Sequence, residues 1–123
     1  NLRDSAFYDL ERILDICEKL DLQVLIDPHR YPGTMHKWTM LGNDPFWKEA
    51  KYHDIAENIW IEIAKRTGKR GKVVAGLDIL NEPGFGHGFE KGTLGDINLF
   101  YERFIKSIRK YDTKISCLYR NIV

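Results

Sequence analysis

The sequence lacks three features that mark common protein classes: a long apolar run, an excess of one charge and a high cysteine content. None of its apolar stretches approaches the ~20 residues that a membrane-spanning helix needs. The formal net charge is only +1, which gives no electrostatic reason to expect nucleic acid or a membrane as a partner. The two cysteines, Cys17 and Cys117, have no matching histidine pattern for zinc, and we expect both to be buried free thiols.

The chain does contain enough apolar material for one core. With 123 residues, 43% of them hydrophobic, residues 1–123 are predicted to form a single domain. The helices are predicted from Asp4 or Ser5 to about Leu20, from Asp44 to about Arg66 and from Asp96 to about Lys110, and the strands at 22–27, 73–80 and 115–119. This alternation predicts an α/β fold with parallel strands and right-handed crossovers.

Several local details follow from the same patterns. The first helix is predicted to bury one stripe, formed by Leu10, Ile13, Leu14, Cys17 and Leu20. Asp44 is predicted to cap the second helix, with Pro45 in its first turn, and Gly68 to end it in a left-handed conformation. The basic turn at 69–72 is predicted to be a solvated connection.

Strand parity separates two sets of side chains. Alternation places Val73, Ala75, Leu77 and Ile79 on the face expected to meet helices, and Gly76, Asp78, Leu80 and Glu82 on the other. In the first strand, Leu25, Asp27 and His29 likewise share a face. The simplest interpretation of Asp27 and Asp78 is that they form hydrogen bonds in a polar layer inside the fold. The candidates for a functional role are then the groups at the strand exits.

The exit of the strand at 73–80 is the most informative part of the chain. An apolar run ends there in Asn81-Glu82-Pro83. In parallel α/β folds, residues at the carboxyl ends of strands face the ligand crevice. A glutamate in that position, beside an amide and followed by a proline, is well placed for general acid/base catalysis.

Two groups of residues resemble glycoside hydrolase family 5, of the cellulase superfamily. Asp27-Pro28-His29, followed by Tyr31-Pro32-Gly33, is similar to the end of the third barrel strand of that family. The stretch from Phe46 to Pro83, ending in Asn81-Glu82-Pro83, is similar to the next helix and strand four. The resemblance extends to about Lys114 and implies part of a TIM (β/α)8 barrel, from helix two to about strand five.

The resemblance implies a role for each matching residue. Glu82 corresponds to the general acid/base, Asn81 to a ligand of the sugar 2-hydroxyl, and His29 to a residue that lines a sugar subsite. Sugars also stack on aromatic rings, and the loops offer Tyr31 and Trp38 as substrate-binding platforms, with Phe85, His87 and Phe89 as further candidates. The substrate class implied is a polysaccharide or oligosaccharide with β-linkages, cleaved with retention.

The same resemblance exposes a missing partner. A complete barrel takes about 250 residues, and the nucleophile of the family, a glutamate on strand seven, has no counterpart in this sequence. We therefore expect no hydrolysis by the chain alone, and either a homo-oligomer or association with the remainder of a barrel. The alternative is an inactive, self-associating half-barrel with residual sugar binding.

Two other binding functions are disfavoured. The glycine-rich stretch 84–88 follows a strand but lacks the spacing of a dinucleotide or Walker motif. The four histidines at 29, 36, 53 and 87 have no acidic partner at ligand spacing, so no metal and no cofactor are expected. Neither the particular polysaccharide nor the cellular compartment is predicted.

Overall fold

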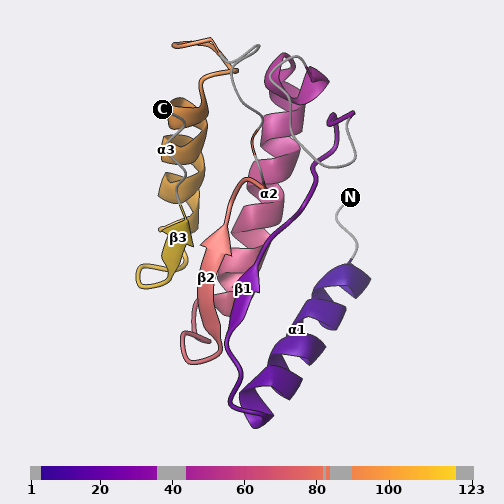
Figure 1. Cartoon of the computed structure of the whole chain (residues 1–123), viewed down its shortest axis with the longest axis vertical. Helices are drawn as coiled ribbons and strands as arrows, with labels where there is room; N and C mark the ends of the chain where they lie inside the picture. The colour runs from indigo at the N-terminus through magenta and orange to yellow at the C-terminus, as the bar shows by residue number, and fades with distance from the viewer. Residues whose placement is uncertain (1–3, 36–43, 82, 84–89, 119–123) are drawn as a thin grey trace.

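The computed structural model describes residues 4–35, 44–81, 83 and 90–118. Its elements are α1 (Asp4–Lys19), β1 (Val24–Ile26), the 3-10 helix η1 (Pro45–Trp47), α2 (Ala50–Thr67), β2 (Val74–Asp78), α3 (Ile97–Ile108) and β3 (Ser116–Leu118). The α-helices and strands alternate in the predicted order (Figure 1). The α/β fold class is therefore confirmed.

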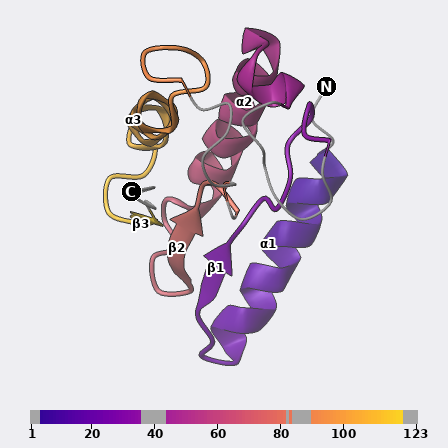
Figure 2. The ribbon, with the colours of Figure 1, turned by 45° about the horizontal axis from the view of Figure 1, so that its top comes forward.

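The three strands form one parallel sheet with β2 in the middle, in the order β1-β2-β3. In Figures 1 and 2, α2 covers one face of the sheet, α1 lies beside β1, and α3 lies next to α2, above the end of β3. No helix of the described residues lies over the other face. Leu25 and Leu118, 51% and 39% exposed, are on this open side. The sheet and helices have the arrangement of a segment of a (β/α)8 barrel.

The predicted alternation along β2 is interrupted by a bulge. Val24 pairs with Val74, but Leu25 already pairs with Gly76, so Ala75 is an extra residue on β2. Val74 is consequently 2% exposed and belongs to the core, whereas Ala75, predicted to meet the helices, is exposed. A bulge shifts the parity of a strand by one residue, which sequence alternation alone does not reveal.

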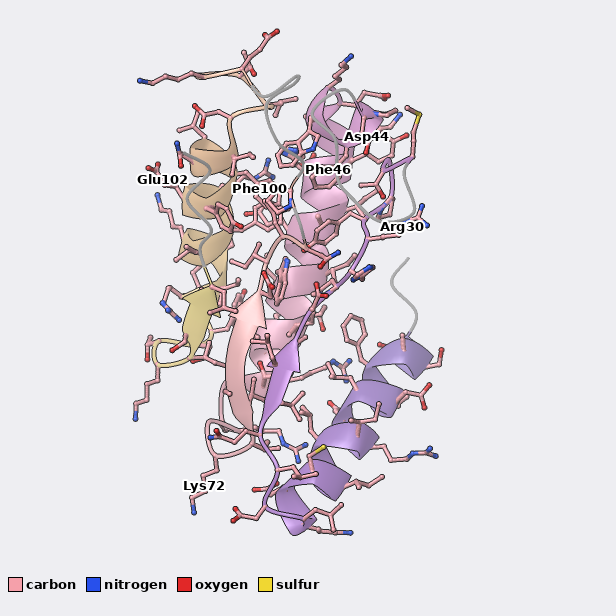
Figure 3. All side chains as sticks on the ribbon, in the orientation of Figure 1. Arg30, Asp44, Phe46, Lys72, Phe100 and Glu102 are labelled. Carbon is pink, nitrogen blue, oxygen red and sulfur yellow. The ribbon has the colours of Figure 1, made fainter. Side chains whose placement is uncertain are left out.

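A cluster of aromatic rings holds α2 and α3 together. Phe100 stacks on Phe104 with centroids 3.9 Å apart, and Phe46 approaches Phe100 at 5.7 Å (Figure 3). His53 lies among these rings, 4.8 Å from Phe46 and 5.1 Å from Phe100, and is only 2% exposed. Burial lowers the pKa of His53 from 6.5 to about 4, with a smaller contribution from the nearby Arg103 cation.

The buried stripe predicted for α1 is only partly correct. Leu14 is fully buried and Leu10 and Cys17 pack partly against the core, but Ile13 and Leu20 are 51% and 63% exposed. Phe7, which is 8% exposed, is the other buried residue of α1 besides Leu14. The stripe is narrow because α1 lies beside β1 and is packed on one flank alone.

Two arginines fasten α1 to the rest of the fold. The Arg66 guanidinium from α2 lies 2.9 Å from Glu11 and 4.8 Å from the ring centre of Phe7. Arg70 donates to Asp15 at 2.5 Å and to Glu18 at 3.1 Å. The basic turn is therefore not simply a solvated connection, because Arg70 in it pairs with α1.

Two predicted helix ends differ from the structure. Asp44 makes no side-chain cap bond, because Pro45 begins the separate 3-10 turn η1 and α2 starts only after Glu49. Gly68 has φ −59°, which is a right-handed conformation and not the predicted left-handed one. The absence of a side chain at Gly68 lets the carbonyl of Tyr111 approach, since an added Cβ would lie 2.7 Å from that oxygen.

The third helix begins as predicted, and its cap is confirmed. The Asp96 carboxylate accepts from the backbone N–H groups of Asn98 and Leu99, at 3.0 and 3.3 Å. Within the part of the chain that the structure describes, no helix is both long and apolar enough to cross a bilayer.

Acid should destabilise the fold through His53. The unfolded chain binds a proton at this residue below about pH 6.5, whereas the folded chain resists protonation until about pH 4. The contribution of neutral His53 to stability is thus complete above pH 6.5 and is lost as the pH falls towards 4, by up to about 3 kcal/mol. We expect His53→Phe to remove this part of the pH dependence in urea unfolding measured at pH 7 and at pH 4.5.

His29→Phe is the matched control, because the His29 side chain is 54% exposed. The control should keep the full loss of stability on acidification. An equal pH dependence in wild type and His53→Phe would show that burial of His53 has no such effect.

Candidate active site

His29 joins the exits of the two neighbouring strands β1 and β2. Its Nδ1 lies 3.2 Å from the Asp27 carboxylate, and its Nε2 lies 3.3 Å from the side-chain nitrogen of Asn81. His29 and Asn81 are 52 positions apart in the sequence. Asp27, His29 and Asn81 therefore form a continuous hydrogen-bonded chain, which we call the exit chain.

The local sequence explains this geometry. Asp27 follows directly after β1, and Asn81 comes three residues after the last residue of β2. Because β1 and β2 are paired in parallel, with Ile26 opposite Leu77, their carboxyl ends open at the same edge of the sheet. Pro28 restricts the preceding residue to extended backbone, and residues two apart on extended backbone point to the same side.

Tyr31 supports the exit of β2 from inside the fold. Its hydroxyl accepts from the Trp60 indole N–H at 2.5 Å and donates to the Ile79 carbonyl at 2.7 Å. Burial raises the pKa of the Tyr31 phenol far above its usual range. Together the two hydrogen bonds connect α2, the loop after β1 and the exit of β2 through the Tyr31 oxygen.

The position of Tyr31 does not fit its predicted role as a sugar-stacking platform. Only 3% of the residue is exposed, and its ring stacks on Phe46 with centroids 5.3 Å apart. A ring with no open face cannot receive a sugar, so Tyr31 acts here as a support. Gly33, two residues later, has φ 90° and an added Cβ there would lie 2.7 Å from the Tyr52 ring, which fixes the course of this loop.

The other predicted site residues divide between described and undescribed positions. His29 and Asn81 are brought together at the exits of β1 and β2. Glu82 and Trp38 lie outside the described residues, and so do Phe85, His87 and Phe89.

Sequence reasoning underestimated Asp27 and Trp60. Asp27 is predicted only as part of a polar layer and Trp60 has no predicted role at the site, yet each holds a residue at the site through a hydrogen bond. The spacing Asp-Pro-His was the available signal for Asp27, since the proline sets the two side chains on one side. Nothing in the sequence indicated that the buried indole N–H of Trp60 would find Tyr31.

Negative charge accumulates at these strand exits. The Asp27 side chain is 30% exposed, and Asp78, at the end of β2, is 5% exposed. Both carboxylates are close enough to contribute to the raised pKa of Tyr31. Over the ranges that the structure describes, no three His, Cys, Asp or Glu side chains gather as a metal site.

Comparison with known proteins places these features in a family. The family model for cellulase (glycosyl hydrolase family 5) matches residues 1–123. The chain belongs to glycoside hydrolase family 5. It is also 27% identical over 115 residues to a beta-xylosidase of Phanerodontia chrysosporium, an alignment that covers 90% of this chain and 23% of that protein. The family 5 chain thus spans about a quarter of the length of this curated relative.

Family membership confirms the resemblance that the sequence suggested from Asp27-Pro28-His29 and Asn81-Glu82-Pro83. The individual roles of Glu82, Asn81 and His29 stay predictions.

Removing the Tyr31 hydroxyl should weaken the fold at the β2 exit. In Tyr31→Phe the Trp60 N–H and the Ile79 carbonyl lose their shared partner while remaining buried, which costs about 1–3 kcal/mol of unfolding free energy. Tyr8→Phe is the control, because Tyr8 is 65% exposed and its hydroxyl has water available. Urea unfolding curves measure both variants, and equal stability of the two would rule out the supporting role of Tyr31.

Proposed function

We propose that this chain carries the acid/base half of a retaining glycosidase site that acts on a β-linked polysaccharide or oligosaccharide. Glu82 is the proton donor to the glycosidic oxygen and later the base that activates water. Asn81 bonds the sugar 2-hydroxyl, and His29 bonds hydroxyls in the adjoining subsite. The observation that carries the proposal is the His29–Asn81 contact at two neighbouring strand exits, directly before Glu82 in the sequence.

The chemistry of the described residues fits this role. Imidazole and amide groups bind sugar hydroxyls as both donors and acceptors. The exit chain and the buried Tyr31 hold Asn81 and its strand in place before substrate arrives, and such preorganisation is what an oxocarbenium-like transition state requires.

The charge of the site also suits an acid. A general acid must hold its proton near neutral pH, and neighbouring carboxylates favour the protonated form of a glutamate. Asp27 and Asp78 supply negative charge at the exits of the two strands. Asp78 precedes Glu82 by four positions on the same segment.

The second carboxylate of a retaining pair lies roughly 5 Å from the acid. We propose that this nucleophile is contributed from outside the 123 residues, so the chain alone should not hydrolyse aryl cellobiosides or soluble β-glucans. Exo- and endo-acting enzymes share such a scaffold, and the name of the fungal relative makes a β-xyloside one suitable test substrate.

The acid/base role of Glu82 is best tested with a nucleophile present. A chimera would carry these 123 residues in place of the matching segment of the fungal relative, assayed with two aryl β-xylosides. Glu82→Gln should lower kcat/KM by about 10²–10⁴-fold for phenyl xyloside, whose leaving group needs protonation. The loss should be much smaller for dinitrophenyl xyloside, whose leaving group departs without a proton.

Glu90→Gln is the matched control, because Glu90 is an exposed glutamate eight positions further along. It should leave both rates unchanged. Equal losses for the two substrates in Glu82→Gln would contradict an acid role and indicate a general disturbance of the site.

A second candidate function is self-association without catalysis, and the exposed apolar residues of the open sheet face favour it. Leu25 and Leu118 lie there, and the two outer strands have unpaired edges among the described residues. In this case the chain sediments as an oligomer in analytical ultracentrifugation, and Leu25→Lys shifts it towards monomer. A single monomer boundary for the wild type would exclude this candidate.

A further inference from the structure

We propose that Asp27 is a positioning residue that fixes the tautomer of His29 and, through it, the orientation of the Asn81 amide. The inference rests on the proposed function for its relevance to sugar binding, but its structural part stands on the exit chain alone. The hydrogen bond of the Asp27 carboxylate is to His29, and the hydrogen bond to Asn81 is made by the other ring nitrogen of His29. The influence of Asp27 passes through the two nitrogens of one imidazole ring.

The direction of each hydrogen bond follows from the chemistry of the end group. An ionised carboxylate only accepts, so the His29 Nδ1 at 3.2 Å from Asp27 must carry the proton in the neutral ring. Nε2 is then an acceptor, and the group 3.3 Å away must donate. Asn81 satisfies this with its Nδ2, the atom found at that place.

The tautomer of His29 determines which polar atoms of the Asn81 amide are available to other partners. With Nδ2 engaged by His29, the amide keeps its carbonyl oxygen and one N–H for other partners. In the opposite tautomer, Nε2–H would donate to the carbonyl oxygen, leaving two N–H groups and a partly used acceptor. A sugar hydroxyl approaching Asn81 therefore meets a different set of polar atoms in the two states.

The backbone makes Asp27 suited to this task. It follows the last residue of β1 directly and is separated from His29 only by Pro28, whose ring removes one backbone torsion. The carboxylate is therefore held close to Nδ1 at little conformational cost. Since histidine in water favours the Nε2–H tautomer, a carboxylate at Nδ1 reverses the ordinary preference.

Long-range ¹H–¹⁵N NMR of the 123-residue chain reads the tautomer without sugar or activity. At about pH 8, where an ordinary imidazole is neutral, His29 should show a protonated Nδ1 and an unprotonated Nε2. Asp27→Asn should move the ring towards Nε2–H, because an amide can donate to Nδ1. Asp9→Asn, a change of an exposed aspartate on α1, should leave the ring unchanged.

The wild-type spectrum alone can overturn the proposal. A protonated Nε2 in the wild type, or an unchanged ring in a folded Asp27→Asn chain, would show that Asp27 does not set the tautomer. If Asp27→Asn fails to fold, Asn81→Ala serves as the second variant. It removes the donor to Nε2 but leaves Asp27 in place, so the ring should keep its protonated Nδ1. A ring that changes to Nε2–H in this variant would show that Asn81, and not Asp27, sets the tautomer.

A thermodynamic cycle tests whether Asp27 acts through His29. With cellobiose as the probe, Asp27→Asn should weaken binding about two- to tenfold, the usual worth of one hydrogen bond. The same change in a His29→Ala background should have no further effect. Equal losses in both backgrounds would contradict the relay, whereas absence of all cellobiose binding would count against the proposed function and leave the NMR result standing.

Discussion

The parallel pairing of β1 with β2 is the constraint on which the rest of the site depends. It brings Asp27 and Asn81 to one edge of the sheet although they are far apart in the sequence, and it does so through backbone bonds alone. Two sets of side-chain hydrogen bonds then fix the positions of the two strand exits. His29 bridges the two exits on the solvent side, and Tyr31 fixes the second exit from the interior.

The outer layer of the fold explains why this edge is held firmly. The aromatic rings around Phe46 and Phe100 unite α2 with α3, and the carboxylate of Glu57 accepts from both Arg103 and Ser107 across the same helix pair. Burial alone would raise the pKa of Glu57, but these hydrogen bonds keep it below its ordinary value. The α1 helix is attached differently, by charged contacts of Arg66 and Arg70 around a small apolar contact.

Element type and order could be predicted from the sequence because apolar periodicity and strand length are local properties. The same holds for the Asp96 cap, which depends on three neighbouring residues. The bulge at Ala75 could not be predicted, since it depends on the register with β1. The burial of Tyr31 could not be predicted either. It depends on hydrogen bonds of the hydroxyl with Trp60 and Ile79, which are distant from Tyr31 in the sequence.

We propose that the sheet edge formed by His29 and Asn81 binds sugar in this family 5 chain. The most direct measurement is chemical-shift mapping of the ¹⁵N-labelled chain during titration with xylobiose and cellobiose, and with maltose as an α-linked control. The account predicts that the β-linked disaccharides shift the Asn81 side-chain amide and the His29 ring most strongly, and that maltose does not. Saturating shifts confined to other surfaces, with these two side chains unaffected, would contradict it.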